Sequence, residues 1–314
     1  MNNNQQLHLV IGGAGAIGSA VINELRSRNI PVKALERKKA IKGIETTHAD
    51  VLDLEAFTKA AAGATHIYVC VGLPYFARIW QRDWPSVMKN TIEVCKTYHA
   101  KLIFFDNVYM YGPPPLSMPF TEDNEQKPVT KKGKARKETA DLLLAAMRKG
   151  EVQGVIGRSA DFYGPYAVNS PFYIVFLENI LKNKNPQWLG KPNVRHTYAF
   201  TKDNARALLE LALDESCYGQ VWHLPVGKPV AIEEIMMLIN RYFHSEYKIS
   251  YMPRALLNIM GLFIPILKEA KEMIYQFDDP YVVSFEKFKR KFPNFTVTPY
   301  DRGIQEMIMS FREN

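Results

Sequence analysis

One stretch near the start of the chain, LHLVIGGAGAIG from Leu7 to Gly18, constrains the fold more than any other. It joins a short apolar run, typical of a parallel strand buried on both faces, to glycines at positions 12, 15 and 18. Gly12 suits a tight turn, Gly15 lets the backbone approach a pyrophosphate, and Gly18 lets the next helix pack closely on the strand. Backbone N–H groups at the start of that helix would face the phosphates. The stretch therefore predicts a dinucleotide-binding turn.

The residues that follow complete a strand–helix–strand unit and then repeat it. Apolar residues recur at helical spacing across 16–28, and a second apolar run over 31–35 ends in Glu36-Arg37. Alternating strands and helices predict an α/β protein with a Rossmann-type doubly wound parallel sheet, covered by helices on both faces. The strands are expected near 7–11, 32–35, 45–48, 66–71, 101–105 and 153–158, and the helices near 16–28, 54–62, 84–99 and 134–149.

The pattern becomes less regular in the second half of the chain. Three prolines after Gly112 predict a loop over 112–130, and a loop of this length in a compact fold is usually functional. A strand is expected at 221–224, and helices near 171–183, 203–213, 232–243, 254–275, 284–291 and 301–312. We expect a dinucleotide-binding Rossmann domain over 1–160, to which 191–224 returns. A smaller C-terminal substrate lobe is expected from 161–190 and 225–314.

Composition narrows the setting in which the protein works. The start, MNNNQQ, is polar and does not resemble a signal peptide, and the longest apolar stretch, Ala255–Leu267, is too short to span a membrane. Three widely separated cysteines, Cys70, Cys95 and Cys217, indicate free thiols in a reducing compartment rather than disulfides or a metal site. These features predict a cytoplasmic protein without a membrane segment.

The chain has a net charge of +8, and part of the excess of basic residues is concentrated in two runs, at 37–39 and 131–137. A basic protein can bind nucleic acid without sequence preference. No nucleic-acid motif accompanies the runs, so solvated faces or contacts to an anionic ligand are favoured, and no specific nucleic-acid partner is expected.

Further motifs follow in order along the chain: Ala49–Asp53, Asn90-Thr91, Val108–Gly112, Arg158–Pro165, Asp203–Ala207, Gly219–Leu224 and Ile232–Ile235. Together with the G-x-x-G-x-x-G spacing of 12, 15 and 18, these motifs resemble the extended short-chain dehydrogenase/reductase family of the NAD-dependent epimerase/dehydratase type. The resemblance covers residues 7 to about 240 and implies a small carbonyl, hydroxyl or sugar-type substrate. It also implies that the Asp50 side chain meets the adenine amine, and it suggests a homodimer interface on the helices at 84–99 and 134–149.

The resemblance and the glycine turn together predict a cofactor site for NADP or NAD. Glu36 suits the ribose 2′-hydroxyl of NAD, whereas Arg37 suits the 2′-phosphate of NADP. Lys38 and Lys39 add to Arg37, and three cations against one carboxylate favour NADP. The expected cofactor-binding residues are Gly12, Ala14, Gly15, Ala16, Ile17, Glu36, Arg37, Asp50, Val51, Gly72 and Lys134.

The chain departs from the family where its chemistry is expected. The family pairs a Tyr that exchanges the substrate proton with a Lys four residues later, and places a Ser or Thr after the fifth strand. Here Asn107 occupies the Ser position, and no Tyr lies between Tyr111 and Tyr163. Aligning Lys134 with the family Lys puts Thr130 at the Tyr, and an alkyl hydroxyl does not titrate near neutrality. The usual proton relay is therefore absent.

Other side chains are candidates for the missing chemistry. Asn107, Lys134 and Tyr109 are the candidate catalytic residues, with Asp106 as a further candidate general base. Arg195 is a candidate for holding an anionic substrate group.

Two functions remain open on this basis. The first is an NAD(P)-dependent oxidoreductase or epimerase-like enzyme with a degenerate active site, favoured by Lys134, the loop at 112–130 and the substrate lobe. The second is a catalytically inactive NAD(P)-binding regulatory or redox-sensing protein, favoured by the missing Tyr. Nucleic-acid binding through the basic runs is the least favoured function.

Overall fold

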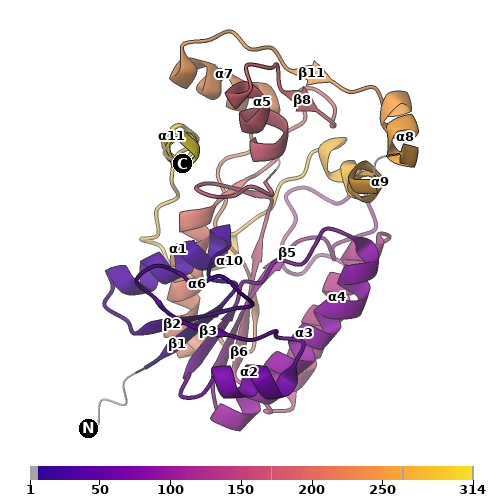
Figure 1. Ribbon diagram of the computed structural model, residues 1–314. Coiled ribbons are helices and arrows are strands. Elements are labelled where there is room, and N and C mark those ends of the chain that lie inside the picture. The colour runs from indigo at the N-terminus through magenta and orange to yellow at the C-terminus, as the bar shows by residue number, and fades with distance from the viewer. Residues whose placement is uncertain (1–5, 171, 264, 313–314) are drawn as a thin grey trace.

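A parallel seven-stranded sheet forms the centre of one half of the molecule (Figure 1). The structure is a computed structural model that describes residues 6–170, 172–263 and 265–312. The strand order is β10-β6-β5-β4-β1-β2-β3, so the chain starts beside the middle of the sheet and winds outward in both directions. The strands are β1 (His8–Ile11), β2 (Val32–Glu36), β3 (Glu45–His48), β4 (His66–Val69), β5 (Lys101–Asn107), β6 (Gly154–Ser159) and β10 (Val221–His223).

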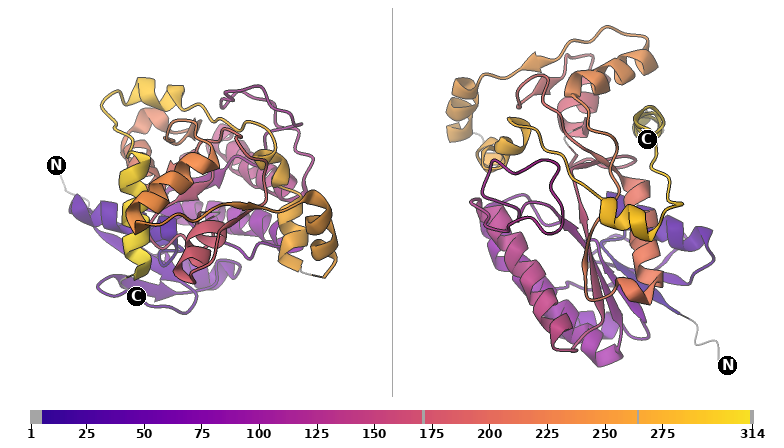
Figure 2. Two further views of the ribbon diagram at one scale, coloured as in Figure 1. Left: turned by 90° about the horizontal axis from the view of Figure 1, so that it is seen from above. Right: turned by 180° about the vertical axis from the view of Figure 1, so that it is seen from behind.

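Helices cover both faces of this sheet (Figure 2). Alternate residues of one strand enter different cores: Leu9 packs on the side of α3 and α4, whereas Val10 packs on the side of α1 and α6. This two-sided burial explains why the inner strands are mainly apolar, and it confirms the doubly wound fold predicted from the sequence. The helices of this half are α1 (Ala16–Ser27), α2 (Leu54–Ala60), α3 (Ala77–Tyr98), α4 (Lys131–Arg148) and α6 (Thr201–Leu213).

The remaining elements form a smaller group above the carboxyl ends of the strands (Figure 1). Its core is rich in aromatic side chains and includes Tyr163, Phe172, Trp188 and Tyr198. Its elements are β7 (Phe162–Tyr163), a π-helix (Phe172–Leu177), α5 (Glu178–Leu181), β8 (Gln187–Trp188), β9 (Ala199–Phe200), α7 (Ile232–Phe243), β11 (Ser250–Tyr251), α8 (Arg254–Phe263), α9 (Pro265–Lys271), a 3-10 turn (Ile274–Phe277) and α11 (Tyr300–Arg312).

Several element boundaries differ from those expected. Helix α3 begins at Ala77 rather than near 84, so that Pro85 lies inside the helix. The turns before the proline are stabilised because Trp80 and Trp84 are buried there. The helix expected over 254–275 is divided into α8, α9 and a 3-10 turn, and the one expected over 171–183 begins as a π-helix. Positions 171 and 264 within these two helices, and residues 1–5 of the polar start, lie outside the described residues.

The tail of the chain crosses back to the sheet. Helix α10 (Glu286–Lys291) packs near β10, and its Phe288 is fully buried in the core shared by α1 and α6. The division into a Rossmann domain and a substrate lobe stays a prediction. The sequence did not indicate that α10 packs back against the sheet.

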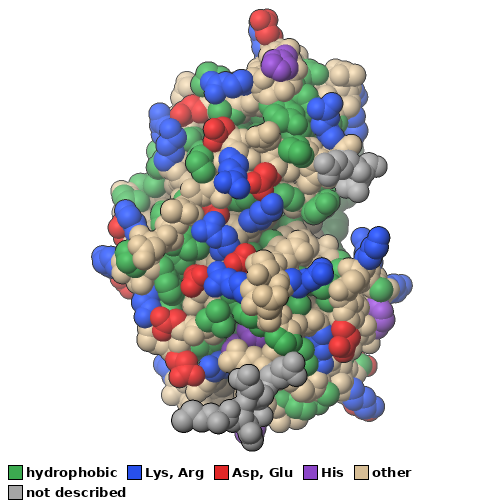
Figure 3. Space-filling view, turned by 90° about the vertical axis from the view of Figure 1, so that its left-hand side faces the viewer, with side chains coloured by type: hydrophobic (Ala, Val, Ile, Leu, Met, Phe, Trp, Pro, Cys, Tyr) green, Lys and Arg blue, Asp and Glu red, His purple; other side chains and the backbone are tan. Residues whose placement is uncertain are grey.

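The described part of the chain has free thiols and a surface of mixed charge. None of its helices has the length and apolar character needed to traverse a bilayer. Cys70, Cys95 and Cys217 are free thiols. On the face seen in Figure 3, basic and acidic side chains are interspersed over both halves of the molecule.

Candidate active site at the carboxyl edge of the sheet

The glycine turn between β1 and α1 depends on close backbone contacts. Gly12 has a φ of +78°, and a Cβ there would lie 2.8 Å from the Cα of Val71 after β4. A Cβ on Gly18 would overlap the carbonyl oxygen of Gly12, so only glycine lets α1 approach the turn. The amide of Gly15 donates to that same carbonyl at 3.0 Å. The turn is therefore tight and leads directly into the helix.

The start of α1 is open to an anionic ligand. Gly15 is the N-cap residue and provides no side-chain cap for the first amides of the helix, which include those of Ala16 and Ile17. Such an uncapped N-terminus attracts phosphate through its N–H groups and its dipole. A Cβ on Gly72, after β4, would have no atom within 4 Å, so the fold leaves space there. These features fit the diphosphate of a dinucleotide.

Glu36, the last residue of β2, is held against the glycine turn. Its carboxylate Oε1 accepts a hydrogen bond from the Ala14 amide at 2.6 Å. The neighbouring Arg37 is exposed. A carboxylate fixed beside the turn is suited to bind ribose hydroxyls.

The segment after β3 is anchored from helix α3. The Asn90 side-chain amide donates to the carbonyl oxygen of Val51 at 2.8 Å. Asp50 is exposed, and its carboxylate accepts from the Leu52 amide at 3.0 Å. The structure therefore fixes this loop and leaves the Asp50 side chain at the surface.

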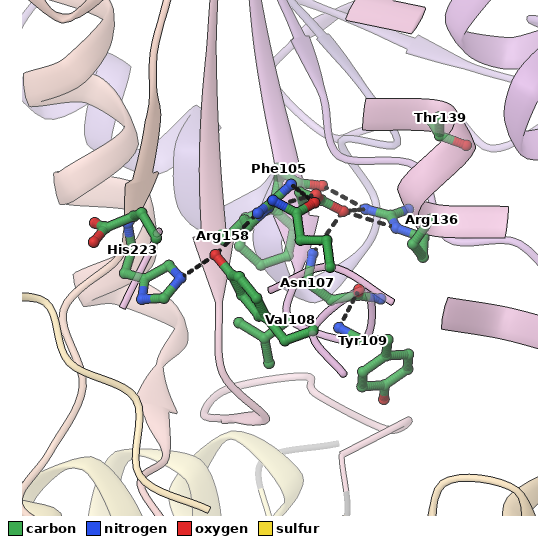
Figure 4. Close-up of polar contacts among 12 residues, drawn as sticks. Phe105, Asn107, Val108, Tyr109, Arg136, Thr139, Arg158 and His223 are labelled. Atoms are coloured by element: carbon green, nitrogen blue, oxygen red, sulfur yellow. Dashed lines mark hydrogen bonds and ion pairs between the residues drawn. The ribbon is translucent and has the colours of Figure 1, made fainter. Parts of the chain in front are cut away.

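Asp106, near the end of β5, lies at the centre of a buried cluster of charges with Arg136 and Arg158. Figure 4 labels these two arginines beside Phe105 and Asn107 of the same strand. Its carboxylate accepts from Arg136 Nε at 2.8 Å, from Arg158 Nε at 3.2 Å and from the Asn107 amide at 2.8 Å. Burial lowers the pKa of Arg136, and the charge of Asp106 opposes that effect. Because the carboxylate is engaged by two cations, it is poorly placed to act as the general base considered from the sequence.

The same cluster extends through Tyr111. Its hydroxyl accepts from Arg158 Nη1 at 2.9 Å and lies 2.6 Å from Nε2 of His223. Nδ1 of His223 lies 2.8 Å from the carbonyl of Ser284 and must donate to it, so Nε2 accepts from the Tyr111 hydroxyl. Burial raises the pKa of Tyr111 to about 12 and lowers that of His223 to about 3. Tyr111 is thus a buried structural phenol.

Asn107 and Tyr109 both lie at the end of β5, as the sequence predicts. The Asn107 side-chain oxygen accepts from the Tyr109 amide at 3.1 Å, which shapes the turn. The Tyr109 ring stacks on Trp80, with centroids 6.1 Å apart, and its hydroxyl is bonded to Tyr75. Burial raises the pKa of Tyr109 well above its ordinary value. A phenol of this kind exchanges protons poorly at neutral pH.

Helix α4 presents different residues to the site than the sequence alignment suggests. Thr130 is the N-cap, and its hydroxyl accepts from the Gly133 amide at 3.0 Å. Lys134 is exposed on the outer side of the helix, where it lines a surface hollow of about 530 Å³ with Lys137 and Asp141. A residue on the outer side of a helix does not face the sheet. The position of Lys134 therefore does not support the expected contact between Lys134 and a nicotinamide ribose.

Two basic residues of α4, Lys132 and Arg136, are buried, and they have the four-residue spacing of the family's Tyr and Lys. Lys132 is fully buried, and its Nζ lies 2.6 Å from Glu269 Oε2 and 3.0 Å from Glu272 Oε1. It also lies 4.4 Å from the centre of the Tyr75 ring. The only sequence signal for this pair is a Gly between two basic residues, which is too common to identify a site.

Arg195 is bound to α7 and to the segment that precedes this helix. Its Nη1 donates to Glu234 Oε1 at 2.8 Å and to the carbonyl of Pro229 at 2.9 Å. Within the described residues no group of three or more His, Cys, Asp or Glu side chains is arranged to hold a metal ion.

Two relatives are similar to this chain in sequence. The chain is 22% identical over 328 residues to the UDP-N-acetyl-alpha-D-glucosaminuronate decarboxylase of Bacillus cytotoxicus, covering 97% of each protein. It is 28% identical over 182 residues to UDP-arabinose 4-epimerase 1 of Arabidopsis thaliana, covering 50% of this chain and 43% of that protein.

Solved structures share the fold. The UDP-glucose 4-epimerase of Thermotoga maritima with UDP-glucose aligns with a TM-score of 0.80 at 18% identity, covering 98% of this chain and 99% of that one. The UDP-glucuronic acid 4-epimerase of Bacillus cereus in complex with NAD aligns with a TM-score of 0.80 at 16% identity and the same coverage. The model of the NAD dependent epimerase/dehydratase family matches residues 8–220, and the chain belongs to that family.

Proposed function

We propose that the protein is an NAD-dependent oxidoreductase or epimerase-like enzyme that acts on a sugar-type small molecule, in the manner that the names of its relatives describe. The observation that carries this proposal is the Glu36 carboxylate, which is hydrogen-bonded to the glycine turn. The membership of the chain in the epimerase/dehydratase family supports it further. Bound NAD would supply a hydride acceptor. The residues that would hold it are the amides after Gly15, the Glu36 carboxylate and the loop at Asp50 and Val51.

The choice between the two cofactors depends on Glu36. Its bond to the Ala14 amide fixes a negative charge where a 2′-phosphate would lie, and this arrangement favours NAD. Arg37, Lys38 and Lys39 are exposed and remain the argument for NADP. A comparison of the dissociation constants of NAD and NADP, with Glu36→Gln as a variant, tests the choice. We expect wild type to prefer NAD and the variant to lose that preference.

The missing Tyr supports a second candidate, a cofactor-binding protein without turnover. Thr130 serves as a helix cap, Lys132 is bound by two carboxylates, and the Tyr109 phenol has a raised pKa. None of these groups matches the proton donor of the family. The substrate lobe over the carboxyl ends of the strands favours an enzyme.

A thermal-shift titration with NAD, NADH, NADP and NADPH tests the proposal first. A ligand present at 100 times its dissociation constant stabilises the folded protein by about 2.7 kcal/mol. We expect a saturable rise in melting temperature with NAD or NADH. The absence of a shift with all four nucleotides would refute both candidate functions.

We also propose a homodimer formed through the outer faces of α3 and α4. The hollow of about 530 Å³ beside Lys134 and Leu142 lies on this side of α4. Light scattering on the purified protein checks the mass, and an introduced charge, Leu142→Glu, should dissociate the dimer. A monomeric mass for the wild type at micromolar concentration would contradict the proposal.

A further inference from the structure

Helix α8 carries a stripe of large apolar side chains on its exposed side. Leu256, Ile259 and Phe263 are 45%, 57% and 79% exposed, and spacings of three and four residues place them on one face of the helix. Leu257 is 1% exposed, so another side of α8 packs against the protein. The helix lies at the outer margin of the molecule (Figures 1 and 2). The stripe therefore faces solvent although the helix itself is anchored.

Two carboxylates, in α9 and just after it, bind the starts of two helices that cover the sheet. Glu269 Oε2 accepts from the Ala77 amide of α3 at 2.8 Å and lies 2.6 Å from Nζ of Lys132. Glu272 accepts from the amides of Lys131 and Lys132 of α4, each at 3.2 Å. Because these carboxylates are engaged on the inner side of α9, they do not neutralise cations on its outer side.

The outer side of the same segment is basic. Lys268 and Lys271 are exposed there, and Arg78 and Lys131 are exposed at the starts of α3 and α4. Within the described ranges, none of these four cations has a carboxylate in ion-pair contact. Phe76, the N-cap residue of α3, is 39% exposed and adds an aromatic ring to this surface. The stripe of α8, this ring and the four cations together form what we call the α8–α9 face.

The carboxylates that follow α9 also have partners. Asp278 forms an ion pair with Arg254 at the start of α8, and Asp279 lies 4.0 Å from Lys191. Single exposed apolar residues are ordinary in proteins, but a contiguous exposed patch marks an interaction surface. The cations of the α8–α9 face define the charge of the partner, which must be negative.

We propose that the α8–α9 face binds the surface of an anionic lipid bilayer. The apolar stripe enters the boundary between headgroups and acyl chains, and the cations lie against lipid phosphates, which their long side chains reach. Helices that lie on a membrane combine an apolar face with Lys and Arg in this way, and they need not be able to span it. A second copy of this chain is a poorer occupant, because the same four cations on each copy would repel one another. The inference goes beyond the proposed function and needs no bound cofactor.

Co-sedimentation of the purified protein with lipid vesicles tests the inference. One set of vesicles is phosphatidylcholine alone, and the other contains about one-third phosphatidylglycerol. We expect a partition coefficient at least about tenfold higher for the anionic vesicles at low salt, and a fall as salt is added. Lys268→Gln/Lys271→Gln should lower it by at least about tenfold, since each cation near an anionic surface contributes about a factor of five. Ile259→Ser/Phe263→Ser should lower it by a similar factor.

Matched controls change the same residue types elsewhere on the surface. Lys184→Gln/Lys248→Gln alters two exposed lysines in the segments before β8 and β11. Met237→Ser alters an apolar side chain of α7 that is 61% exposed. Both controls should keep the wild-type partition coefficient to within about twofold. The lysine variant and the apolar variant act through different side chains, so one still tests the inference if the other does not fold.

Equal partition of the wild type onto neutral and anionic vesicles, or binding to neither, would overturn the inference. Variants of the α8–α9 face that bind as the wild type does would also overturn it. Light scattering without vesicles identifies the other occupant: if Ile259→Ser/Phe263→Ser lowers the mass of the particle, the stripe is an interface between copies and the membrane proposal is wrong. Failure of the proposed function is recognised separately, by the absence of a thermal shift with the nicotinamide nucleotides.

Discussion

Replacing Asp106 with Asn removes the negative charge that Arg136 and Arg158 share inside the protein. The Asp106 and Arg158 side chains are fully buried, and Arg136 is 3% exposed. Removing one member of a buried ion pair costs about 3–5 kcal/mol, because an unpaired charge remains. With an unfolding entropy of about 2.1 cal/mol/K per residue, 314 residues give about 0.7 kcal/mol/K. The melting temperature should therefore fall by roughly 5–8 °C.

Urea and thermal unfolding followed by circular dichroism measure this loss. Asp123→Asn is the control, because Asp123 is exposed in the loop before α4, and a surface change of this kind stays within about 0.5 kcal/mol. The reasoning is refuted if Asp106→Asn lowers the free energy of unfolding by no more than the control does. That result would mean that the two guanidinium groups find other partners or water.

Three further perturbations test other parts of the structure. Burial lowers the pKa of His8 and His223 to about 3 and that of His66 to about 4, so below about pH 6.5 only the unfolded chain takes up these protons. The free energy of unfolding should thus fall by about 4 kcal/mol from pH 7.5 to 5.5 in urea titrations, and a flat profile would contradict these shifts. Gly18→Ala should lower the melting temperature, because its Cβ overlaps the Gly12 carbonyl; an unchanged value would show that the turn can move. Gly72→Ala should leave the melting temperature unchanged but weaken NAD binding in a fluorescence titration, and equal affinity would place the cofactor elsewhere.

The sheet and the cofactor turn were predictable because their signals are local. The inner strands of the sheet are buried on both faces and therefore read as apolar runs. Gly18 is required by a contact with Gly12, six residues away, and Gly12 by the segment after the neighbouring strand β4. The N-terminus of α3 was less predictable, because burial of its tryptophans outweighs the helix-breaking tendency of Pro85.

The candidate site was predictable only in part, because its partners are distant along the chain. Lys132 is bound by carboxylates 137 and 140 residues later, and nothing near Lys132 in the sequence indicates them. Lys134 matched the family pattern in sequence, yet helix geometry directs the side chain of Lys132 inward instead.

Turnover of a sugar nucleotide tests the central claim most directly. Proton NMR of the purified protein with NAD and UDP-glucose, followed over hours, detects an epimerised or oxidised sugar without a coupled assay. The account predicts a changed sugar signal that depends on both protein and NAD. Binding of NAD with no change in UDP-glucose, or in the related UDP-N-acetylglucosamine, would contradict an enzymatic role and favour the cofactor-binding regulator.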